Sequence, residues 1–570
     1  MTAPTNASKS NSDPNLKDIS AAPFARWLPF LAWPRPDAAL LRADIGAGLA
    51  VGLVIVPQSV AYAALAGMPL VTGLYAALLP AMIAALFSAS SRLSVGPSAL
   101  TALLVSASLA GLAQPVSAHW VSLAVWLAIL TGLVQLVVGL ARATWVLNLI
   151  SAPVLMAFTQ AAVLLIVASQ LPALIGLTGP LAGLLDRSAL DLVAMTFGLG
   201  TVAVMLACKW LVPRAPTVML VVVATALLSW LSGYSATGLV VGALPAGLPD
   251  GYWPMLPDWH SLPTLLASAL VIALVSSLET ASSAKIEARF SGTRWNANQD
   301  MIGQGLAKLA SALSGSFVTS TSFSRSAIAL YAGGRSGWSV VASTVFVLAT
   351  LLFVTPALQH VPRAVLAAIV IVAVVGLLQP MAFVQLWRID RVEAAIAAVT
   401  FLVTLVSAPR IHWGVLTGVV LCLAQFLYHR LHPRIIELSL HPDGSLRARS
   451  QWNLPALGSE LYALRMDAEL DFASANAFER ALVDHLAANP QVVDVCLFAQ
   501  PINRVDATGV DVLRQIAADL AARGITLHIC GLKLPVQAAL ERAQLIGSAG
   551  NIRLYRTDAE ALAILIKPRP

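Results

Sequence analysis

Long apolar runs separated by short polar stretches cover most of the chain between residues 44 and 430. A helix needs about 20 apolar residues to cross the hydrocarbon core of a membrane. Ending each run at proline, glycine or a charged residue predicts fourteen segments, seven on each side of a polar loop from Gly233 to His260. The predicted segments lie near residues 44–64, 70–88, 94–113, 120–140, 152–175, 189–208, 217–232, 263–284, 300–318, 322–332, 337–356, 363–386, 392–407 and 411–429.

Two of these segments are too short or too polar to cross a membrane as simple helices. One begins with Ser94-Val95-Gly96-Pro97 and the other with Ser322-Phe323-Ser324-Arg325, and each is the third segment of its half. The first segments also match, because Leu53-Val54 with Gln58-Ser59 resembles Leu274-Val275 with Glu279-Thr280. Since seven is an odd number, the second half enters the membrane from the opposite side. The sequence therefore predicts an inverted repeat, which places the site of a secondary transporter near the membrane midplane.

Beyond residue 459 the pattern changes to alternating strands and helices. Strand-like runs lie at Leu461–Met466, Val492–Phe498 and Ile525–Cys530, and helical patterns lie at Ala475–Ala487, Thr508–Arg523 and Pro535–Gln544. This alternation predicts a small α/β domain. The expected organisation is a disordered tail over 1–25, transmembrane repeats over 26–235 and 236–432, a linker over 433–458 and the α/β domain over 459–563.

Composition agrees with a chain that lies mostly in a membrane. Hydrophobic residues make up 58% of the sequence and charged residues only 11%, with a mean hydropathy of +0.79. Soluble domains carry about 25% charged residues. The net charge is +7, but the basic residues flank apolar segments as membrane orientation requires, so we expect no nucleic-acid partner. The first twenty residues are polar and lack the apolar core of a signal peptide.

Basic residues in the loops set the expected orientation. If the N-terminus is cytoplasmic, the cytoplasmic loops hold Arg92, Arg142, Lys209, Arg214, Lys285, Arg289, Arg294, Arg335, Arg388 and Arg391. The opposite loops hold only Arg187, Arg363 and Arg410. The positive-inside rule therefore places both termini in the cytoplasm. We expect a multi-pass protein of a bacterial-type inner membrane, with the α/β domain in the cytoplasm.

Arg325 is the sharpest candidate for function, because an ionisable residue at membrane depth is costly and marks a functional site. Serine and threonine hydroxyls surround it over residues 320–326, with no carboxylate in that stretch. The chain break before it would expose N–H groups and the positive end of a helix dipole, and the break at Gly96-Pro97 would aim a second helix N-terminus at the same place. These features predict an anion site. The alternative is an arginine that extends to the membrane surface or forms a structural ion pair.

Glu279 is the second candidate, in the otherwise uncharged run 267–284. One interpretation is an ion pair with Lys285 near the cytoplasmic end of the helix. The other is a coupling group that carries a proton, or that binds sodium together with hydroxyls such as Ser282 and Ser283. Import of a dianion against an inside-negative potential costs about 4.6 kcal/mol per 100 mV, and one cotransported cation offsets half of that.

Gln58 and Tyr62 lie one turn apart on the first segment and share a helix face, where Pro57 loosens the backbone. We predict that both contribute to anion binding. The alternative is ordinary hydrogen bonding between helices.

No sequence feature indicates catalysis or a bound metal. The four cysteines, Cys208, Cys422, Cys496 and Cys530, have no metal-binding spacing. Residues 459–563 contain no glycine-rich phosphate loop and no nucleophile–base pair. We therefore expect no disulfide, no metal, no cofactor and no enzymatic activity.

These segments together resemble the sulfate permease (SulP) family, whose animal members include prestin and epithelial anion exchangers. The matching stretches are Val56-Pro57-Gln58-Ser59-Val60-Ala61-Tyr62, Gly73-Leu74-Tyr75, Ser90-Ser91-Arg92-Leu93-Ser94-Val95-Gly96-Pro97, Gly303-Gln304-Gly305-Leu306 and Ser322-Phe323-Ser324-Arg325-Ser326-Ala327. They occur in the family's order, and the resemblance covers about residues 26–560. It implies fourteen segments in a seven-plus-seven inverted repeat, divided into core and gate domains. It also implies a C-terminal STAS domain, shared by sulfate transporters and anti-sigma-factor antagonists, and a homodimer.

Family site residues are carried over by position. The anion site falls on Gln58, Tyr62, Ser98, Ser322, Ser324 and Arg325, with the neighbouring Ala99 and Phe323. The family's acidic position on the eighth segment falls on Glu279, with Ser283 beside it as a second cation-coupling candidate. The phosphorylated Asp-Ser-Ser-Gly motif of the anti-sigma antagonists reads Asp506-Ala507-Thr508-Gly509 here, so Thr508 is the candidate phosphosite. The family's Pro-x-Thr-Gly before the tenth segment reads Val318-Thr319-Ser320-Thr321, a difference that bears on substrate identity.

The favoured hypothesis is a proton-coupled symporter of small anions that works by alternating access. In it, the anion lies at the facing half-helix N-termini of the third and tenth segments. A sodium-coupled symporter and an uncoupled anion channel or exchanger are the alternatives, together with a membrane sensor that uses the α/β domain as its output. Sulfate, bicarbonate and dicarboxylates are all compatible substrates. The expected partners are the anion, the coupling cation, membrane lipid and a second copy of the chain.

Overall fold

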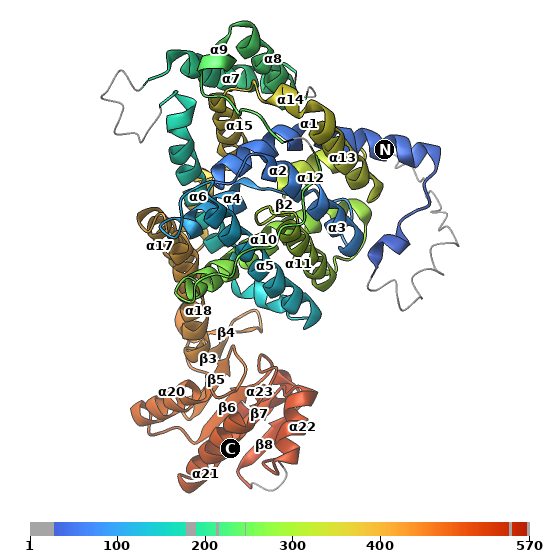
Figure 1. Cartoon of the computed structure of the whole chain (residues 1–570). Coiled ribbons are helices and arrows are strands. Elements are labelled where there is room, and N and C mark those ends of the chain that lie inside the picture. Colours follow the sequence, from blue (N-terminus) through green and yellow to red (C-terminus); the bar gives the residue numbers. More distant parts are fainter. Residues whose placement is uncertain (1–27, 178–189, 213–215, 246, 547–549, 567–570) are drawn as a thin grey trace, which may run out of the picture. The chain divides into compact units, whose positions relative to one another are not determined.

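The computed structural model describes residues 28–177, 190–212, 216–245, 247–546 and 550–566. The chain forms two compact units that divide between Cys422 and Leu423 (Figure 1). The tail predicted over residues 1–25 lies outside the described residues, as do Arg187 and Arg214.

The first unit is helical, and each of the fourteen predicted segments contains a described helix. In the first half these are α1 (Ala38–Leu65), α2 with α3 (Val71–Ala76 and Leu79–Phe87), α4 (Ala99–Leu109), α5 (Ala118–Leu140), α6 (Ala152–Leu174), α7 (Leu192–Leu211) and α8 (Thr217–Leu231). In the second half they are α10 (Leu262–Ser291), α11 (Ala297–Leu313), α12 (Phe323–Tyr331), α13 with α14 (Trp338–Ala349 and Thr355–Leu358), α15 with α16 (Arg363–Val375 and Pro380–Ile389), α17 (Arg391–Val406) and α18 (His412–Leu431). Within the described residues, eight helical stretches are long and apolar enough to cross a membrane, among them α1, α5 and α10.

The two segments predicted to be too short are half-helices. α4 has 11 residues and α12 has 9, and each follows a two-residue strand, β1 (Val95–Gly96) or β2 (Ser320–Thr321). At 1.5 Å per residue a helix of this length reaches about 16 Å, roughly half of the hydrocarbon core. Each half-helix is therefore too short to cross a membrane by itself, as the sequence predicted.

The helix that contains Glu279 is longer than predicted. α10 continues to Ser291, about two turns beyond the expected end at residue 284, and stops at Gly292, whose φ of +64° is left-handed. The charged residues near its end suggested a loop, but Glu287 is buried and forms an ion pair with Arg92. A paired charge is compatible with a buried helix end, so the helix continues.

The segment predicted over 363–386 is broken into α15 and α16. Gln160 of α6 fills the break, because its Nε2 donates to the Leu377 carbonyl (3.0 Å) and its Oε1 accepts from the Gln379 N–H (2.7 Å). Pro380 then begins α16, a position where a missing N–H costs nothing. The glutamine thus satisfies backbone groups that a membrane interior would otherwise leave unpaired.

The second unit is an α/β domain with a six-stranded sheet of order β4-β3-β5-β6-β7-β8. Its strands are β3 (Ile435–Leu440), β4 (Leu446–Ala448), β5 (Leu461–Met466), β6 (Asp494–Phe498), β7 (Thr526–Cys530) and β8 (Ile552–Tyr555). Its main helices are α20 (Ala475–Ala488), α21 (Ala507–Ala522), α22 (Leu534–Arg542) and α23 (Asp558–Leu565). The strands β5 to β8 are parallel, and β3 pairs with β5 antiparallel. The predicted strands and helices are present, and β8 and α23 are additional.

The expected linker over 433–458 is wrong as a description of these residues, because they contribute β3 and β4 to the sheet. Leu438 of β3 is buried with Leu461 and Ala463 of β5. The added hairpin covers the edge of β5, which would otherwise expose unpaired backbone groups. The hairpin of β3 and β4 therefore belongs to the α/β domain that follows it.

The Asp506-Ala507-Thr508-Gly509 motif has a structural role in this domain. Asp506 caps α21, because its carboxylate accepts hydrogen bonds from the Gly509 N–H (2.8 Å) and the Phe472 N–H (3.0 Å). A Cβ atom at Gly509 would lie 2.2 Å from the Leu470 carbonyl oxygen, so only glycine fits there. Thr508 is exposed in the first turn of the helix.

Replacing Asp506 with alanine should loosen the first turn of α21. Loss of a helix cap costs about 1 kcal/mol, so amide hydrogen exchange in that turn of the full-length protein should become roughly fivefold faster. Asp506→Asn keeps an oxygen acceptor and should exchange nearly as wild type does. Unchanged exchange in the alanine variant would contradict the capping role.

Candidate anion-binding site

Two half-helices begin near the centre of the helical unit (Figure 1). β1 and β2 form an antiparallel pair, and each runs directly into its half-helix, α4 or α12. Ser98 caps α4 by accepting from the Thr101 N–H (3.2 Å), and Ser322 caps α12 by accepting from the Arg325 N–H (3.5 Å). The first turn of a helix has further N–H groups without intrahelical partners. Two positive dipole ends therefore meet at this pair of strands, an arrangement that favours an anion.

A cavity of about 250 Å³ opens at these two N-termini. Its polar wall comes from α1, α4, α10 and α12, and its apolar wall comes from α6 and α15. The predicted site residues that line the cavity are Tyr62, Ser98, Ala99, Glu279, Ser322, Phe323 and Ser324. Gln58, Ser283 and Arg325 are not among its lining residues.

Arg325 is buried behind the half-helix junction, with 1% of its surface exposed. Its Nε donates to Ser94 Oγ (3.2 Å) and its Nη1 to Gln58 Oε1 (3.4 Å). Its Nη2 has no hydrogen-bond partner within the described part of the chain. Because successive helix residues are rotated by about 100°, Arg325 points away from the cavity that Phe323 and Ser324 line. The sequence predicted that Arg325 lies at the start of a half-helix but not the direction of its side chain.

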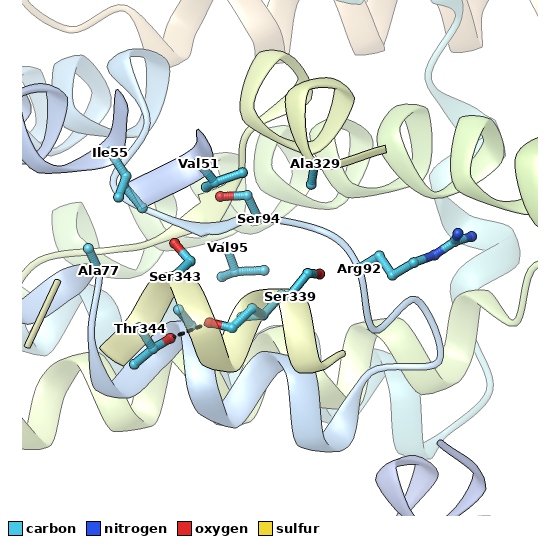
Figure 2. Close-up of a pocket in the computed structure, with 12 residues that line it drawn as sticks. Val51, Ile55, Ala77, Arg92, Ser94, Val95, Ala329, Ser339, Ser343 and Thr344 are labelled. Atoms are coloured by element: carbon cyan, nitrogen blue, oxygen red, sulfur yellow. Dashed lines mark hydrogen bonds between the residues drawn. The ribbon is translucent and has the colours of Figure 1, made fainter. Parts of the chain in front are cut away.

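Gly96 lies beside both Ile55 and the Arg325 guanidinium group. A Cβ atom there would lie 3.5 Å from Arg325 Nη2 and 3.3 Å from Ile55 Cδ1. Figure 2 shows a pocket on this side of the junction, with Ile55 and Ser94 in its wall. Its volume is about 10 Å³, close to the space of one water molecule and too small for an oxyanion. An anion would therefore occupy the larger cavity, and Arg325 would act on it through its electric field.

Glu279 connects both half-helices. Its Oε2 accepts from Ser320 Oγ (2.5 Å), just before α12, and from Ser98 Oγ (3.5 Å), at the start of α4. The alternative ion pair with Lys285 does not describe this geometry, because the Lys285 ammonium lies over the Trp295 ring, 5.8 Å from its centroid. The carboxylate faces the cavity and not the end of α10 that holds Lys285.

The second predicted coupling residue is oriented differently. The Ser283 hydroxyl donates to the Glu279 carbonyl oxygen one turn earlier (3.0 Å), and its side chain is buried. Ser282 lines the cavity instead. Because the two serines are adjacent on α10, they lie on different faces of the helix, and only Ser282 faces the cavity.

Lys308 of α11 is a site residue that the sequence interpretation missed. It is fully buried, and its Nζ donates to Ser276 Oγ (2.9 Å). Both Lys308 and Arg325 interact electrostatically with Glu279. A lysine in the middle of an apolar segment meets the same criterion that identified Arg325, so the signal was present. Glu279 therefore has two buried basic side chains as electrostatic partners.

The Gly303-Gln304-Gly305 motif supports this centre from α11. Gln304 Nε2 donates to Thr321 Oγ1 of β2 (3.0 Å), which also bonds to Thr280 Oγ1 of α10 (2.9 Å). A Cβ atom at Gly305 would lie 2.8 Å from the Gly132 carbonyl oxygen of α5. Small residues allow this close helix contact in a membrane. The motif therefore holds β2, and with it the start of α12, in place.

Comparison with known families and proteins agrees with this architecture. The profile of the sulfate permease family matches residues 41–400, and the profile of the STAS domain matches residues 456–561. Sulfate transporter 4.1, chloroplastic, from Arabidopsis thaliana is 29% identical over 572 residues, which cover 96% of this chain and 82% of the relative. The sodium-independent sulfate anion transporter of Bos taurus is 28% identical over 578 residues, covering 93% and 90%.

The fold has a counterpart among solved structures. The murine anion transporter solute carrier 26 family member A9, in its inward-facing state, superposes with a TM-score of 0.85 at 20% identity. The superposition covers 94% of this chain and 93% of that one. The predicted fold class, a helical membrane transporter with a C-terminal STAS domain, is confirmed. Because the family profile spans residues 41–400 of 570, including both half-helices and the cavity, the chain belongs to the sulfate permease family.

Proposed function

We propose that the chain is a proton-coupled secondary active transporter of small anions. In this proposal the anion binds in the cavity at the N-termini of α4 and α12, and the proton binds Glu279. The observation that carries it is the hydrogen bonding of Glu279 to both Ser98 and Ser320, which places a titratable carboxyl group between the two half-helices. Proton and anion would then share one cavity.

The charges around the cavity would couple the two ligands. With Glu279 ionised and both buried basic residues, Arg325 and Lys308, protonated, the three charges sum to one positive charge. Protonation of Glu279 raises the sum to two, which strengthens the attraction for an anion and most of all for a dianion. By thermodynamic linkage, the bound anion increases proton affinity by the same factor. A symporter requires this mutual preference.

The hydrogen-bond partners of Glu279 suit both of its protonation states. A serine hydroxyl can donate to an ionised carboxylate and can accept from a protonated carboxyl group. Ser320 and Ser98 can therefore stay bonded when the proton arrives or leaves. Sodium would need a shell of oxygen ligands beside the two buried cations, so a proton fits this site better.

The two walls of the cavity suggest how access alternates. The polar groups lie on one side, on the half-helices and α10, whereas α6 and α15 contribute mainly apolar residues such as Val163, Ile166 and Val374. An apolar wall has few directional contacts to break when the opposite wall moves. This division favours an elevator-like or rocking movement of the polar wall along the apolar one.

The remaining assignments follow from the sequence and from the relatives. We propose cytoplasmic N- and C-termini in a bacterial-type inner membrane, repeats over 26–235 and 236–432, and a homodimer. Sulfate is the first substrate to test, because the Arabidopsis thaliana and Bos taurus relatives are named as sulfate transporters. Thr508 is exposed, as a phosphosite must be, and its modification remains a proposal.

Glu279→Gln should uncouple transport from the proton gradient. The glutamine keeps the shape of the side chain but cannot gain or lose a proton. In proteoliposomes, wild-type sulfate uptake should increase as the external pH falls. The variant should lose this dependence and fail to accumulate sulfate, yet still exchange anions at equal concentrations.

Glu393→Gln on α17, outside the cavity lining, is the matched control and should behave as wild type. Accumulation by Glu279→Gln on a pH gradient at the wild-type level would exclude Glu279 as the coupling group. Uptake that depends on sodium but not on pH would identify sodium, and not a proton, as the coupling cation. Large anion currents that do not saturate with anion concentration would favour the alternative of an uncoupled anion channel.

Arg325→Ala should weaken anion binding without preventing membrane insertion. A unit charge at roughly 8 Å, in an effective dielectric constant of about 20, contributes about 2 kcal/mol. The KM for anion uptake should therefore increase roughly tenfold or more, and concentrative uptake should disappear. Arg325→Lys keeps the charge and should lose much less. A wild-type KM in a correctly inserted alanine variant would contradict the role of Arg325.

A chain that ends at residue 432 should retain measurable anion exchange. The cavity lining lies between residues 62 and 377, whereas β3, the first strand of the α/β sheet, begins at Ile435. The truncation therefore removes the whole sheet and leaves the proposed site intact. Exchange in proteoliposomes checks this, with size-exclusion chromatography to confirm folding. Complete loss of exchange from a well-folded truncation would show that the STAS domain takes part in transport itself.

A further inference from the structure

Three loops of the helical unit meet at a second pocket, separate from the transport cavity. They connect α3 to β1, α10 to α11 and α12 to α13, and the pocket between them has a volume of about 410 Å³. Each loop contributes one arginine to its wall, namely Arg92, Arg294 and Arg335. Glu287 at the end of α10 is the one carboxylate among the residues that line it.

The arginines are not equivalent. Arg92 Nε forms an ion pair with Glu287 Oε1 (3.0 Å), and its other nitrogens donate to the Gly334 carbonyl (3.3 Å) and to Ser291 Oγ. Arg92 is therefore part of the framework. Arg294 and Arg335 are exposed, and the described residues offer their side chains no ion pair or hydrogen bond. Two unneutralised guanidinium groups remain in the pocket wall.

Two further residues of the wall, Ser90 and Trp295, are held in place by hydrogen bonds to Asp300. The Trp295 indole N–H donates to Asp300 Oδ2 (2.7 Å), and Ser90 donates to the same carboxylate through its N–H (2.9 Å) and its hydroxyl (2.7 Å). Asp300 is buried, and its carboxylate accepts hydrogen bonds from these donors. It is not among the residues that line the pocket. The pocket is therefore concave and already shaped before any ligand binds.

We propose that this pocket binds the phosphate group of an anionic lipid headgroup or of a free phosphate compound, with Arg294 and Arg335 as its two cationic contacts. A guanidinium group presents a planar pair of donors that matches phosphate oxygens. The volume is that of a small-molecule site. Basic pockets between membrane helices on the cytoplasmic side also suit lipid headgroups. Phe290 and Tyr331, exposed at the ends of α10 and α12 with their rings 5.6 Å apart, are residues that favour a membrane interface.

The loops connect this pocket to the transport cavity. One leads into β1 and α4, and another follows α12, while α10 carries both Glu279 and Glu287. A phosphate held by Arg294 and Arg335 would tie the loop after α10 to the loop after α12. Such a ligand would change the transport rate by restraining these helices. Phosphate binding to this pocket does not depend on the proposed transport function. Only the expected effect on the transport rate rests on that proposal.

Binding to the purified full-length protein tests the proposal. The probes are inorganic phosphate and dioctanoylphosphatidylglycerol, with dioctanoylglycerol as the lipid that lacks phosphate. The variant is Arg294→Gln with Arg335→Gln. The control is Arg388→Gln with Arg391→Gln, which removes the same charge from exposed positions outside the pocket. Thermal unfolding of each protein confirms folding.

Loss of two charge-assisted contacts should weaken binding of a phosphate probe about tenfold or more in the pocket variant. The control variant should bind the phosphate probes as wild type does. Dioctanoylglycerol, which lacks phosphate, should show no difference in binding among the three proteins. A loss for both phosphate probes identifies the phosphate group as sufficient, and a loss for the lipid alone identifies a headgroup site. Equal binding by the pocket variant and wild type, an equal loss in the control variant, or no binding of either probe to wild type would overturn the proposal.

Discussion

A membrane interior offers no water to a broken helix, and this constraint governs the centre of the protein. Two segments stop halfway across and expose backbone groups at the point where they restart. The structure pairs β1 with β2, caps each half-helix with a serine, and uses Ser94 to bridge the halves through its own N–H and carbonyl groups. What these contacts leave open is the first turn of α4 and of α12. The same breaks that threaten stability therefore leave open N–H groups, and we propose that the anion binds there.

The break between α15 and α16 shows the opposite solution to the same problem. There the Gln160 side chain uses its donor and its acceptor on the two sides of the break. No positive dipole end is left beside a buried cation, so nothing in that break calls for a ligand. At α4 and α12, by contrast, the buried Arg325 guanidinium group lies close to the open N–H groups, and buried Lys308 interacts electrostatically with Glu279. The pattern of partners, and not the break alone, separates a structural interruption from a binding site.

The sequence was most informative where physical cost is highest. Arg325 and Glu279 were identified because a charge in an apolar run is expensive, and the half-helices were identified because their segments were too short. Direction was not predictable, since a rotation of one residue places Arg325 behind the junction while Ser324 lines the cavity. Contacts between distant segments were missed for a similar reason. Nothing local to the α15–α16 break indicates that Gln160 fills it, and β3 became recognisable as a strand only beside β5. The roles of the cavity residues in binding remain predictions.

Four acidic residues of these helices show why Glu279 differs from its neighbours. Asp44 accepts from two backbone N–H groups and a serine hydroxyl, and Asp300 from a backbone N–H, an indole N–H and a hydroxyl. Glu287 faces the guanidinium group of Arg92. Each of these three carboxylates therefore has at least one N–H donor among its partners, and an N–H donor has no lone pair to accept a carboxyl proton. Glu279 is bonded to two hydroxyls, which can reverse their role when a proton binds. The case for Glu279 as the coupling group therefore rests on the chemistry of its partners, beyond the presence of a charge within the membrane.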